Sequence, residues 1–487
     1  MLLNRIPLYP VALVAAMVLA AFVDSDLHPA VLWRPLALAA VGASVVQILL
    51  TVLTGKPHRA AVVTAGVLVA IRAGDLPHVA LALVLLAAVA AAIAFYARIR
   101  RTRPTIATLT RAANPISFIL LVSVVASGVA NGTAGRIVAD LQRPAVALGA
   151  AEESPNIYVL LLDGHPRADT LQRVFAYDND AFLAGLEQRG FDVASHSRSN
   201  YMYTELTLSS MLHMRHTGEL FETEPSSRRL IADNPVFAEL RERGYRIFAN
   251  ALPWEGVAMR SADSFCGDGS TTEFEFHLMH VTALLPLAQV VEPTLLGDRW
   301  RKYVDQAFSC LSRSLDYGAS QLVFTHVPSP HLPIVFQADG APAPLAIYSD
   351  TAQELDISAD TFNRAYVDQL EHIHERVILA VDEVITADPD AIVLVMSDHG
   401  SESRFDWADA RLSDLDERFG ILFAARTPGR DCLFGGAPTP VNTFPVILDE
   451  YFGLDIARQP DSTFVSTAQA KRDTETIPNP DLHRGSC

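Results

Sequence analysis

Two apolar runs of this sequence end in side chains that commonly bind metal ions. PNIYVLLLDG at 155–164 ends in Asp163, and AIVLVMSDHG at 391–400 ends in Asp398 and His399. Runs rich in Val, Leu and Ile are typical of buried parallel strands, whose carboxyl ends meet at one edge of a sheet. Carboxylates with an imidazole suit a divalent metal ion, with manganese or zinc favoured over magnesium or calcium. The structural alternatives are an Asp-Gly turn and a polar SDHG loop.

A threonine between these runs supplies a hydroxyl group. Thr204 precedes the helix-like stretch ELTLSSMLHM at 205–214. A helix N-terminus stabilises negative charge, and a metal ion lowers the pKa of a bound hydroxyl, so Thr204 is the predicted nucleophile and a metal ligand. Its structural alternative is an ordinary N-cap. Thr207, Ser209 and Ser210 are rival hydroxyls, and the two serines lie inside the helical pattern, where burial is expected.

The N-terminal part of the chain differs from the rest in charge and hydropathy. Residues 1–150 contain 12 Lys and Arg against 4 Asp and Glu, and the remaining residues contain 26 against 51. Several apolar windows are each about as long as a bilayer requires, whereas a signal peptide carries only one. They lie near 7–23, 32–54, 59–73, 76–97 and 115–132. We predict a transmembrane helical bundle of about five helices at 1–132, in which the third window has a re-entrant or interfacial segment as its alternative.

The charges of the connecting loops predict the orientation of this bundle. Lys56 and Arg59 separate the second window from the third. Five arginines crowd the connector before the last window: Arg98, Arg100, Arg101, Arg103 and Arg111. Because positive loops stay in the cytoplasm, the N-terminus is expected inside and everything after about residue 133 outside. This predicts a multi-pass protein of the plasma (inner) membrane with an extracytoplasmic acidic domain.

The acidic part is expected to contain a linker at 133–153, a catalytic domain at 154–457 and a polar tail at 458–487. In the catalytic domain, helical patterns alternate with strands, as in VFAELRERG followed by YRIFANA. Such repeats predict an α/β domain with a largely parallel sheet between helices. The excess of acidic residues argues against nucleic acid as a partner.

Four cysteines fit an exported domain, because disulfides persist outside the cytoplasm. Pairing Cys266 with Cys310, and Cys432 with Cys487, closes the shorter loops and is the simplest of three arrangements. Unpaired thiols are the alternative.

Four segments in this order resemble the alkaline phosphatase/sulfatase superfamily. They are NIYVLLLDG, TELTLSSML, PSPHLP at 328–333 and SDHG, and the similarity spans about 155–455. The match is closest to the membrane-anchored branch that includes lipoteichoic acid synthases and phosphoethanolamine transferases. The resemblance implies an alkaline-phosphatase-like fold with one metal ion held by four residues: Asp163, Thr204, Asp398 and His399.

The resemblance also implies that His331, in PSPHLP, contacts the transferred group. His326 is the alternative for that role, or a member of a second metal site. His372 and His374 are further candidates for a second site, although YVDQLEHIHERV is typical of an amphipathic helix with exposed imidazoles.

Three more polar residues are predicted to bind an anionic substrate. Arg167 and Asn200 are near Asp163 and Thr204 in sequence, and Arg404 follows SDHG. A solvated helix start, a turn and a loop ion pair are their respective structural alternatives.

These features predict a membrane-bound phosphotransferase that forms a phosphothreonine intermediate. It would move a phospho-head group from a lipid-linked donor, or another membrane lipid, to an envelope glycan or lipid. Sulfatases of the superfamily use cysteine in a C-x-P-S-R setting, which is missing around Thr204, so sulfate-ester chemistry is not favoured. A hydrolase with water as acceptor and a non-catalytic envelope scaffold are the alternatives, and the oligomeric state is open.

Overall fold

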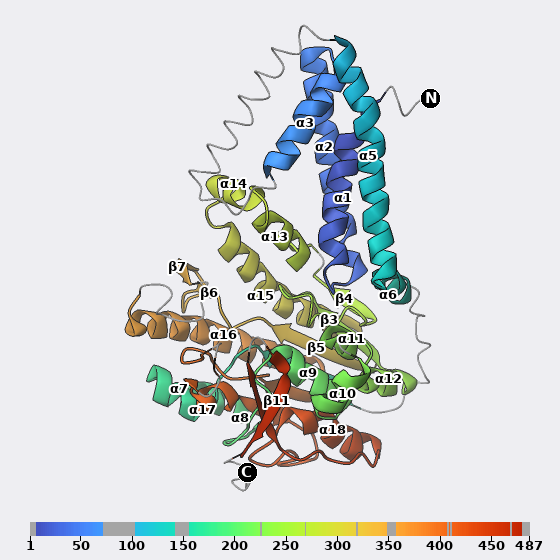
Figure 1. The fold of residues 1–487 in the computed structure, drawn as a ribbon. Coiled ribbons are helices and arrows are strands. Elements are labelled where there is room, and N and C mark those ends of the chain that lie inside the picture. Colours follow the sequence, from blue (N-terminus) through green and yellow to red (C-terminus); the bar gives the residue numbers. More distant parts are fainter. Residues whose placement is uncertain are drawn as a thin grey trace. The chain divides into compact units, whose positions relative to one another are not determined.

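The chain divides into two units, which a computed structural model describes in part (Figure 1). One unit comprises Met1–Pro144 and Thr271–Leu295, and the other comprises Ala145–Ser270 and Leu296–Cys487. The described residues are 6–71, 103–141, 155–224, 226–267, 269–317, 320–347, 357–406, 409, 412–467 and 470–479.

The N-terminal unit is built from apolar helices and a helical pair from later in the chain. Its helices are α1 (Tyr9–Val23), η2 (Pro29–Val31), α2 (Trp33–Thr54), α3 (Pro57–Ile71), α5 (Arg103–Ala130), α6 (Thr133–Leu141), α13 (Glu273–His280) and α14 (Leu284–Val291). The Asn114 side chain of α5 accepts hydrogen bonds from the backbone N–H groups of Leu8 and Tyr9, both at 3.0 Å. These bonds satisfy donors at the start of α1 that an apolar environment would otherwise leave unpaired.

Two helices of the described residues are long and apolar enough to cross a membrane, namely Pro29–Thr54 and Leu109–Ala130. Tyr9–Val23 and Pro57–Val69 are shorter apolar helices, and α13 with α14 forms a pair bent by 98°. Four of the five predicted windows therefore coincide with helices. The window at 76–97 lies outside the described residues, so the number of spans stays a prediction.

The second unit contains a seven-stranded sheet in the order β2-β9-β8-β1-β5-β3-β4. Its strands are β1 (Ile157–Leu162), β2 (Asp192–Val193), β3 (Arg246–Asn250), β4 (Ser264–Cys266), β5 (Gln321–Val327), β8 (Ile392–Met396) and β9 (Phe423–Arg426). The run β8-β1-β5-β3-β4 is parallel, and β9 pairs antiparallel with both of its neighbours. The prediction of a largely parallel α/β sheet is confirmed.

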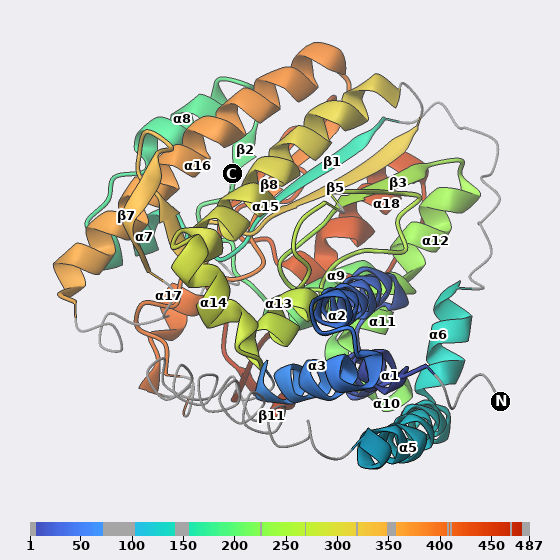
Figure 2. The ribbon, with the colours of Figure 1, turned by 90° about the horizontal axis from the view of Figure 1, so that it is seen from above.

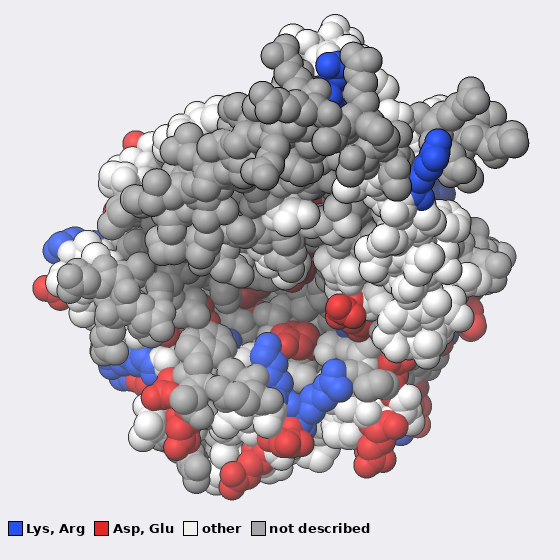
Figure 3. Space-filling view, turned by 45° about the horizontal axis from the view of Figure 1, so that its top comes forward, with Lys and Arg blue, Asp and Glu red and all other residues white. Residues whose placement is uncertain are grey.

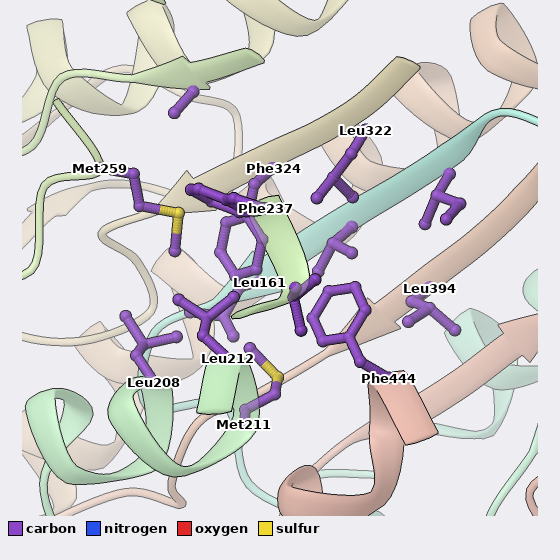
Figure 4. Packing of buried hydrophobic residues seen from close by; sticks show 14 of the residues in the cluster. Leu161, Leu208, Met211, Leu212, Phe237, Met259, Leu322, Phe324, Leu394 and Phe444 are labelled. Carbon is purple, nitrogen blue, oxygen red and sulfur yellow. The ribbon is translucent and has the colours of Figure 1, made fainter. Parts of the chain in front are cut away.

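Helices cover both faces of this sheet (Figure 2). The face with Leu161 packs against α9 (Thr204–His213), α12 (Pro235–Glu242) and α18 (Thr443–Phe452), as Figure 4 shows for Leu208, Phe237 and Phe444. The opposite face packs against α8 (Asp180–Glu187), α15 (Leu295–Ser314) and α16 (Ala359–Ala387). Every residue of β1 is buried because both faces are covered, which explains its uninterrupted apolar run.

Shorter elements connect this framework. They are α7 (Ala168–Phe175), α10 (Thr217–Thr223), α11 (Ser227–Ala232), η3 (Leu315–Tyr317), β6 (Ile334–Phe336), β7 (Pro342–Ile347), α17 (Leu415–Phe419), η5 (Pro440–Asn442), β10 (Thr463–Thr467) and β11 (Ala470–Ile477). The predicted linker at 133–153 begins with α6, and the predicted tail at 458–487 contains the antiparallel β10–β11 hairpin.

Charged side chains of both signs are interspersed on the face drawn in Figure 3. Exposed ion pairs of the second unit include Arg189 with Asp382 and Arg376 with Asp305. Among the described residues on that face, no broad patch of one sign is visible.

Cys266 at the end of β4 is bonded to Cys310 in α15, as predicted. Cys432 is also disulfide-bonded. Its predicted partner, Cys487, lies outside the described residues.

Replacing Cys266 and Cys310 together by serine is expected to destabilise the protein by about 4 kcal/mol, because the unfolded chain gains conformational freedom when the loop is opened. The bonded residues are 44 positions apart. Denaturant unfolding of the full-length protein in detergent, followed by tryptophan fluorescence, measures the change. Identical unfolding midpoints for the oxidised wild type and the double variant would contradict this expectation.

Candidate metal centre and active site

The carboxyl ends of three neighbouring strands bring the predicted metal ligands together. Asp163 follows β1 directly, His326 lies near the end of β5, and Asp398 and His399 follow β8. Because β1 pairs in parallel with both β5 and β8, these side chains share one edge of the sheet. Asp163, Asp398 and His399 are almost completely buried.

The His399 imidazole lies at the middle of this group. Its Nε2 atom is 3.3 Å from Thr204 Oγ1, 3.4 Å from Asp398 Oδ2 and 3.5 Å from Asp163 Oδ1. These separations are close to the edge of a tetrahedron with metal–ligand bonds of about 2.0–2.1 Å, which is about 3.3 Å. Three of the four residues that the resemblance names therefore lie within 3.5 Å of the fourth, His399.

Three atoms of the group offer electron pairs to a cation: His399 Nε2, Asp163 Oδ1 and Asp398 Oδ2. His399 Nδ1 donates to the Gly400 carbonyl oxygen at 2.8 Å, so its Nε2 atom carries a lone pair. Asp163 Oδ1 and Asp398 Oδ2 are buried and have no hydrogen-bond partner. Buried carboxylate oxygens without partners are costly unless a cation compensates them. The residues present thus fit a divalent metal ion.

His331 adds a second imidazole to the group. Its Nδ1 atom donates to the Leu332 carbonyl oxygen at 2.8 Å, and one ligand atom each of Asp163, His331 and His399 lies within 4.8 Å of the others. His326 Nε2 is 2.9 Å from Asp163 Oδ2, so His326 orients that carboxylate by hydrogen bonding.

The ionisation of these side chains suits cation binding. Burial raises the pKa of Asp163, but the imidazoles of His331 and His326 outweigh it and hold the pKa below its usual range. Burial and the positive charge of Arg418 lower the pKa of His399. Asp163 is therefore an anion and His399 a neutral imidazole at neutral pH, the states in which both bind metal ions.

The four candidate hydroxyls have different surroundings. Thr207 donates to the Asp398 carbonyl oxygen at 3.2 Å, Ser209 to that of Glu205 at 2.6 Å and Ser210 to that of Arg215 at 2.7 Å, and all three hydroxyl residues are fully buried. Thr204, the first residue of α9, is half-buried and faces His399. Of the four, Thr204 is the one available for chemistry.

An ion pair that the sequence analysis missed supports His331. Glu402 Oε1 lies 3.4 Å from His331 Nε2, and Glu402 Oε2 accepts from Arg418 at 3.0 Å. Burial lowers the pKa of His331, but Glu402 and Asp163 outweigh it and raise this pKa to about 9. Glu402 comes three residues after His399, which was an available signal. Arg418, in α17, has no sequence signal of this role because tertiary packing alone brings it to Glu402.

Replacing Arg418 by methionine is expected to destabilise the α/β unit by about 3–5 kcal/mol, because Glu402 then stays buried without its arginine partner. The side chains of the pair are only 2% and 6% exposed. Thermal unfolding of the full-length protein measures the effect, with Arg189→Met, which removes an exposed ion pair, as the matched control. Equal shifts of the melting temperature in the two variants would show that the buried pair stabilises the fold no more than the exposed pair does.

A small hollow adjoins the centre. Its polar side is lined by His331, His399 and Glu402. Its apolar side is lined by Phe362 and by the stacked rings of Phe175 and Tyr366, whose centroids are 4.3 Å apart.

The three other predicted substrate ligands make their contacts elsewhere. Arg167 donates to Asp169 at 2.8 Å and to the Ser197 carbonyl oxygen at 3.1 Å. The buried Asn200 amide accepts from Val441 N–H and donates to the Ser462 carbonyl oxygen, both at 2.9 Å. Arg404 is half-exposed and lies 3.7 Å from Asp414. Their assignment as substrate ligands stays a prediction.

The expectation of exposed imidazoles on the long helix is wrong for His374. This residue is 5% exposed, stacks on Phe182 at 3.9 Å and lies 2.8 Å from His165 Nε2. The physical reason is that its position on α16 faces α8 and the end of β1, so the imidazole replaces an apolar side chain in the packing. His372 is partly buried near Phe336, at a ring distance of 4.7 Å.

No protein-family model and no curated protein matches this chain. Solved structures do show similarity. The periplasmic domain of EcEptC from Escherichia coli, in complex with Zn, has a TM-score of 0.42 at 14% identity and covers 70% of this chain and 97% of that one. The lipoteichoic acid synthase LtaP from Listeria monocytogenes has a TM-score of 0.41 at 13% identity, and the match covers 67% of this chain and 81% of that one.

A third similar structure includes a membrane part. The integral membrane protein lipooligosaccharide phosphoethanolamine transferase A from Neisseria meningitidis has a TM-score of 0.41 at 12% identity and covers 94% of this chain and 96% of that one. A lipoteichoic acid synthase and a phosphoethanolamine transferase are the groups that the sequence resemblance names.

Proposed function

We propose that this chain is a membrane-bound, metal-dependent phosphotransferase with Thr204 as its nucleophile. It moves a phospho-head group from a lipid-linked donor to a glycan or lipid of the cell envelope. The observation that carries this proposal is the position of Thr204 Oγ1, at the first residue of α9 and 3.3 Å from His399 Nε2. A hydroxyl at a helix N-terminus beside buried carboxylates has the surroundings that an activated nucleophile needs.

The metal ligands in this proposal are Asp163, Thr204, Asp398 and His399. A divalent ion, when bound, supplies Lewis acidity and lowers the pKa of the threonine hydroxyl. The mixed carboxylate and imidazole set favours manganese or zinc. His326 holds Asp163 in place through its 2.9 Å hydrogen bond.

The transfer has two displacement steps. In the first, a bond forms between Thr204 Oγ1 and phosphorus while the bond from phosphorus to the donor's leaving oxygen breaks. The hydroxyl proton is released and the leaving oxygen takes up a proton. The N–H groups at the start of α9 and the His331 imidazole stabilise the charge on the phosphoryl oxygens. In the second step, a bond forms between the acceptor's hydroxyl oxygen and phosphorus while the bond from phosphorus to Thr204 Oγ1 breaks. The acceptor's proton is released and Thr204 Oγ1 takes up a proton.

Two features of the chain favour a lipid donor: its long apolar helices and the aromatic side of the hollow beside the metal centre. Two helices of the described residues are long and apolar enough to cross a bilayer. The hollow beside the centre has an aromatic wall of Phe175, Phe362 and Tyr366, against which an apolar portion of a substrate packs.

Product analysis tests the proposal and separates it from hydrolysis. The full-length protein in lipid nanodiscs is incubated with manganese or zinc, phospholipids labelled in the head-group phosphate, and envelope lipid and glycan acceptors. We expect labelled acceptor in amounts equal to the lipid alcohol released. Release of the labelled phospho-head group in free form, with no labelled acceptor, would show that the protein is a hydrolase and not a transferase. No product from any donor, together with no bound metal, would favour a non-catalytic scaffold.

A further inference from the structure

Residues 271–295 leave the α/β part of the sequence and belong to the N-terminal helical unit. The chain on either side of this excursion is tied together, because Cys266 before it is bonded to Cys310 after it. This disulfide bond holds β4 and α15 together on either side of the inserted segment.

The first half of the excursion, α13, is attached to α1 and α2. Phe274 is 1% exposed, and its ring meets that of Phe22 edge-on at a centroid distance of 5.5 Å. Glu275 forms a two-pronged ion pair with Arg34. Thr272 starts the helix with a capping box to Glu275. Apolar packing, an ion pair and a cap together fix the position of α13 on the helical unit.

The second half, α14, presents apolar side chains that nothing among the described residues covers. Its sequence, LLPLAQVV, has no charged residue. Leu284 and Leu287 are 44% and 46% exposed, and Val290 and Val291 are 78% and 84% exposed. Exposed clusters of large apolar side chains mark interaction surfaces.

The contacts of the excursion identify which end of the helical unit it meets. Phe22 is at the end of α1, Arg34 at the start of α2 and Ile71 at the end of α3, where its carbonyl oxygen accepts from Ala283 N–H at 2.7 Å. These three helix ends lie on one side, because α1, α2 and α3 alternate in direction. Figure 1 shows α14 beside the end of α3. It is the end for which the loop charges predict an extracytoplasmic position.

We propose that α14 is an interfacial membrane-binding element, and that its partner is the bilayer at the surface where α1 to α3 emerge. Eight residues of helix are about 12 Å long, too short to cross a hydrocarbon core of about 30 Å, and the 98° bend after α13 prevents the pair from forming one straight span. The exposed face lies at the end of the helical unit where α2 starts, and Trp33 and Leu38 near that start are 59% and 63% exposed. An uncharged apolar helix held at that level enters the boundary between head groups and acyl chains.

A fluorescent probe on α14 tests this proposal without relying on catalysis. The variant Val290→Cys is labelled with an environment-sensitive fluorophore in the full-length protein, reconstituted in phosphatidylcholine and phosphatidylglycerol nanodiscs. Leu412→Cys, at a 72% exposed site of the α/β unit, is the matched control. We expect a blue-shifted emission for the α14 probe, with most of it lost when lipids carry spin labels on their acyl chains, and neither effect at residue 412.

Two outcomes would overturn the proposal. Emission and quenching equal to those of the Leu412→Cys control would place α14 in water. A blue shift without quenching by lipid, accompanied by a doubled mass in light scattering, would mean that a second copy of the chain covers the helix. Val291→Cys repeats the experiment at a neighbouring position if the first variant is poorly produced.

Discussion

Replacing Thr204 by alanine is expected to lower the turnover of a phosphodiester donor by at least about three orders of magnitude. The substitution removes the oxygen that is to bond to phosphorus. It leaves in place Asp163, Asp398 and His399, so we expect the metal ion to stay bound. The measurement is the initial rate of head-group transfer by full-length protein in nanodiscs, together with metal content by mass spectrometry.

Two controls make this result specific to the hydroxyl of residue 204. Thr204→Ser restores a hydroxyl and is expected to keep much of the activity. Ser209→Ala removes a hydroxyl of the same helix that donates to the Glu205 carbonyl oxygen, and its rate is expected to stay near that of the wild type. If Thr204→Ala kept full metal-dependent activity, the assignment of the nucleophile would be wrong.

Replacing Asp163 by asparagine is expected to reduce bound metal well below one equivalent and to lower activity more than about 100-fold, since even residues that only orient ligands cost 10–100-fold. The change keeps the shape of the side chain but removes the negative charge. Asp163 Oδ1 is buried without a hydrogen-bond partner, so the wild type gains from a cation that the variant no longer attracts. Metal titration followed by thermal unfolding reports this directly, because an ion that binds the folded state raises the melting temperature.

Asp382→Asn is the matched control for this substitution, because Asp382 is half-exposed and pairs with Arg189 at the surface. It should show the same stabilisation by manganese or zinc as the wild type. Equal metal-dependent stabilisation of the Asp163→Asn variant would remove Asp163 from the ligand set.

The strand ends of the site were predictable because they depend on local pattern. An apolar run ending in an acid marked Asp163 and Asp398 in the sequence, and the parallel pairing of β1 with β8 brings them to one edge. The position of Thr204 was predictable for a similar reason, since the sequence pattern marks the start of the helix there. Its advantage over Thr207 required the structure, in which the latter hydroxyl is committed to the Asp398 carbonyl oxygen.

Features that depend on distant packing were not predictable. Arg418 is almost fully buried because it meets both Glu402 and the Met202 carbonyl oxygen, from segments far apart in the sequence. His374 lies in a helix whose periodicity permits an exposed imidazole, and the structure shows that it is buried, 5% exposed and stacked on Phe182. The apolar segment of α14 is shorter than a membrane-spanning helix, so its sequence did not mark it as a membrane contact. The exposure of its apolar side chains is seen only in the structure.

The central claim is that Thr204 carries the phosphoryl group between donor and acceptor. Its most direct test is tandem mass spectrometry of peptides from full-length protein, quenched in acid after reaction with donor lipid and manganese or zinc in the absence of acceptor. We predict a phosphoryl adduct on Thr204 that requires the metal ion, disappears when acceptor is added and is missing from the Thr204→Ala variant. Continued turnover with an unmodified Thr204, or an adduct on another residue, would contradict the claim.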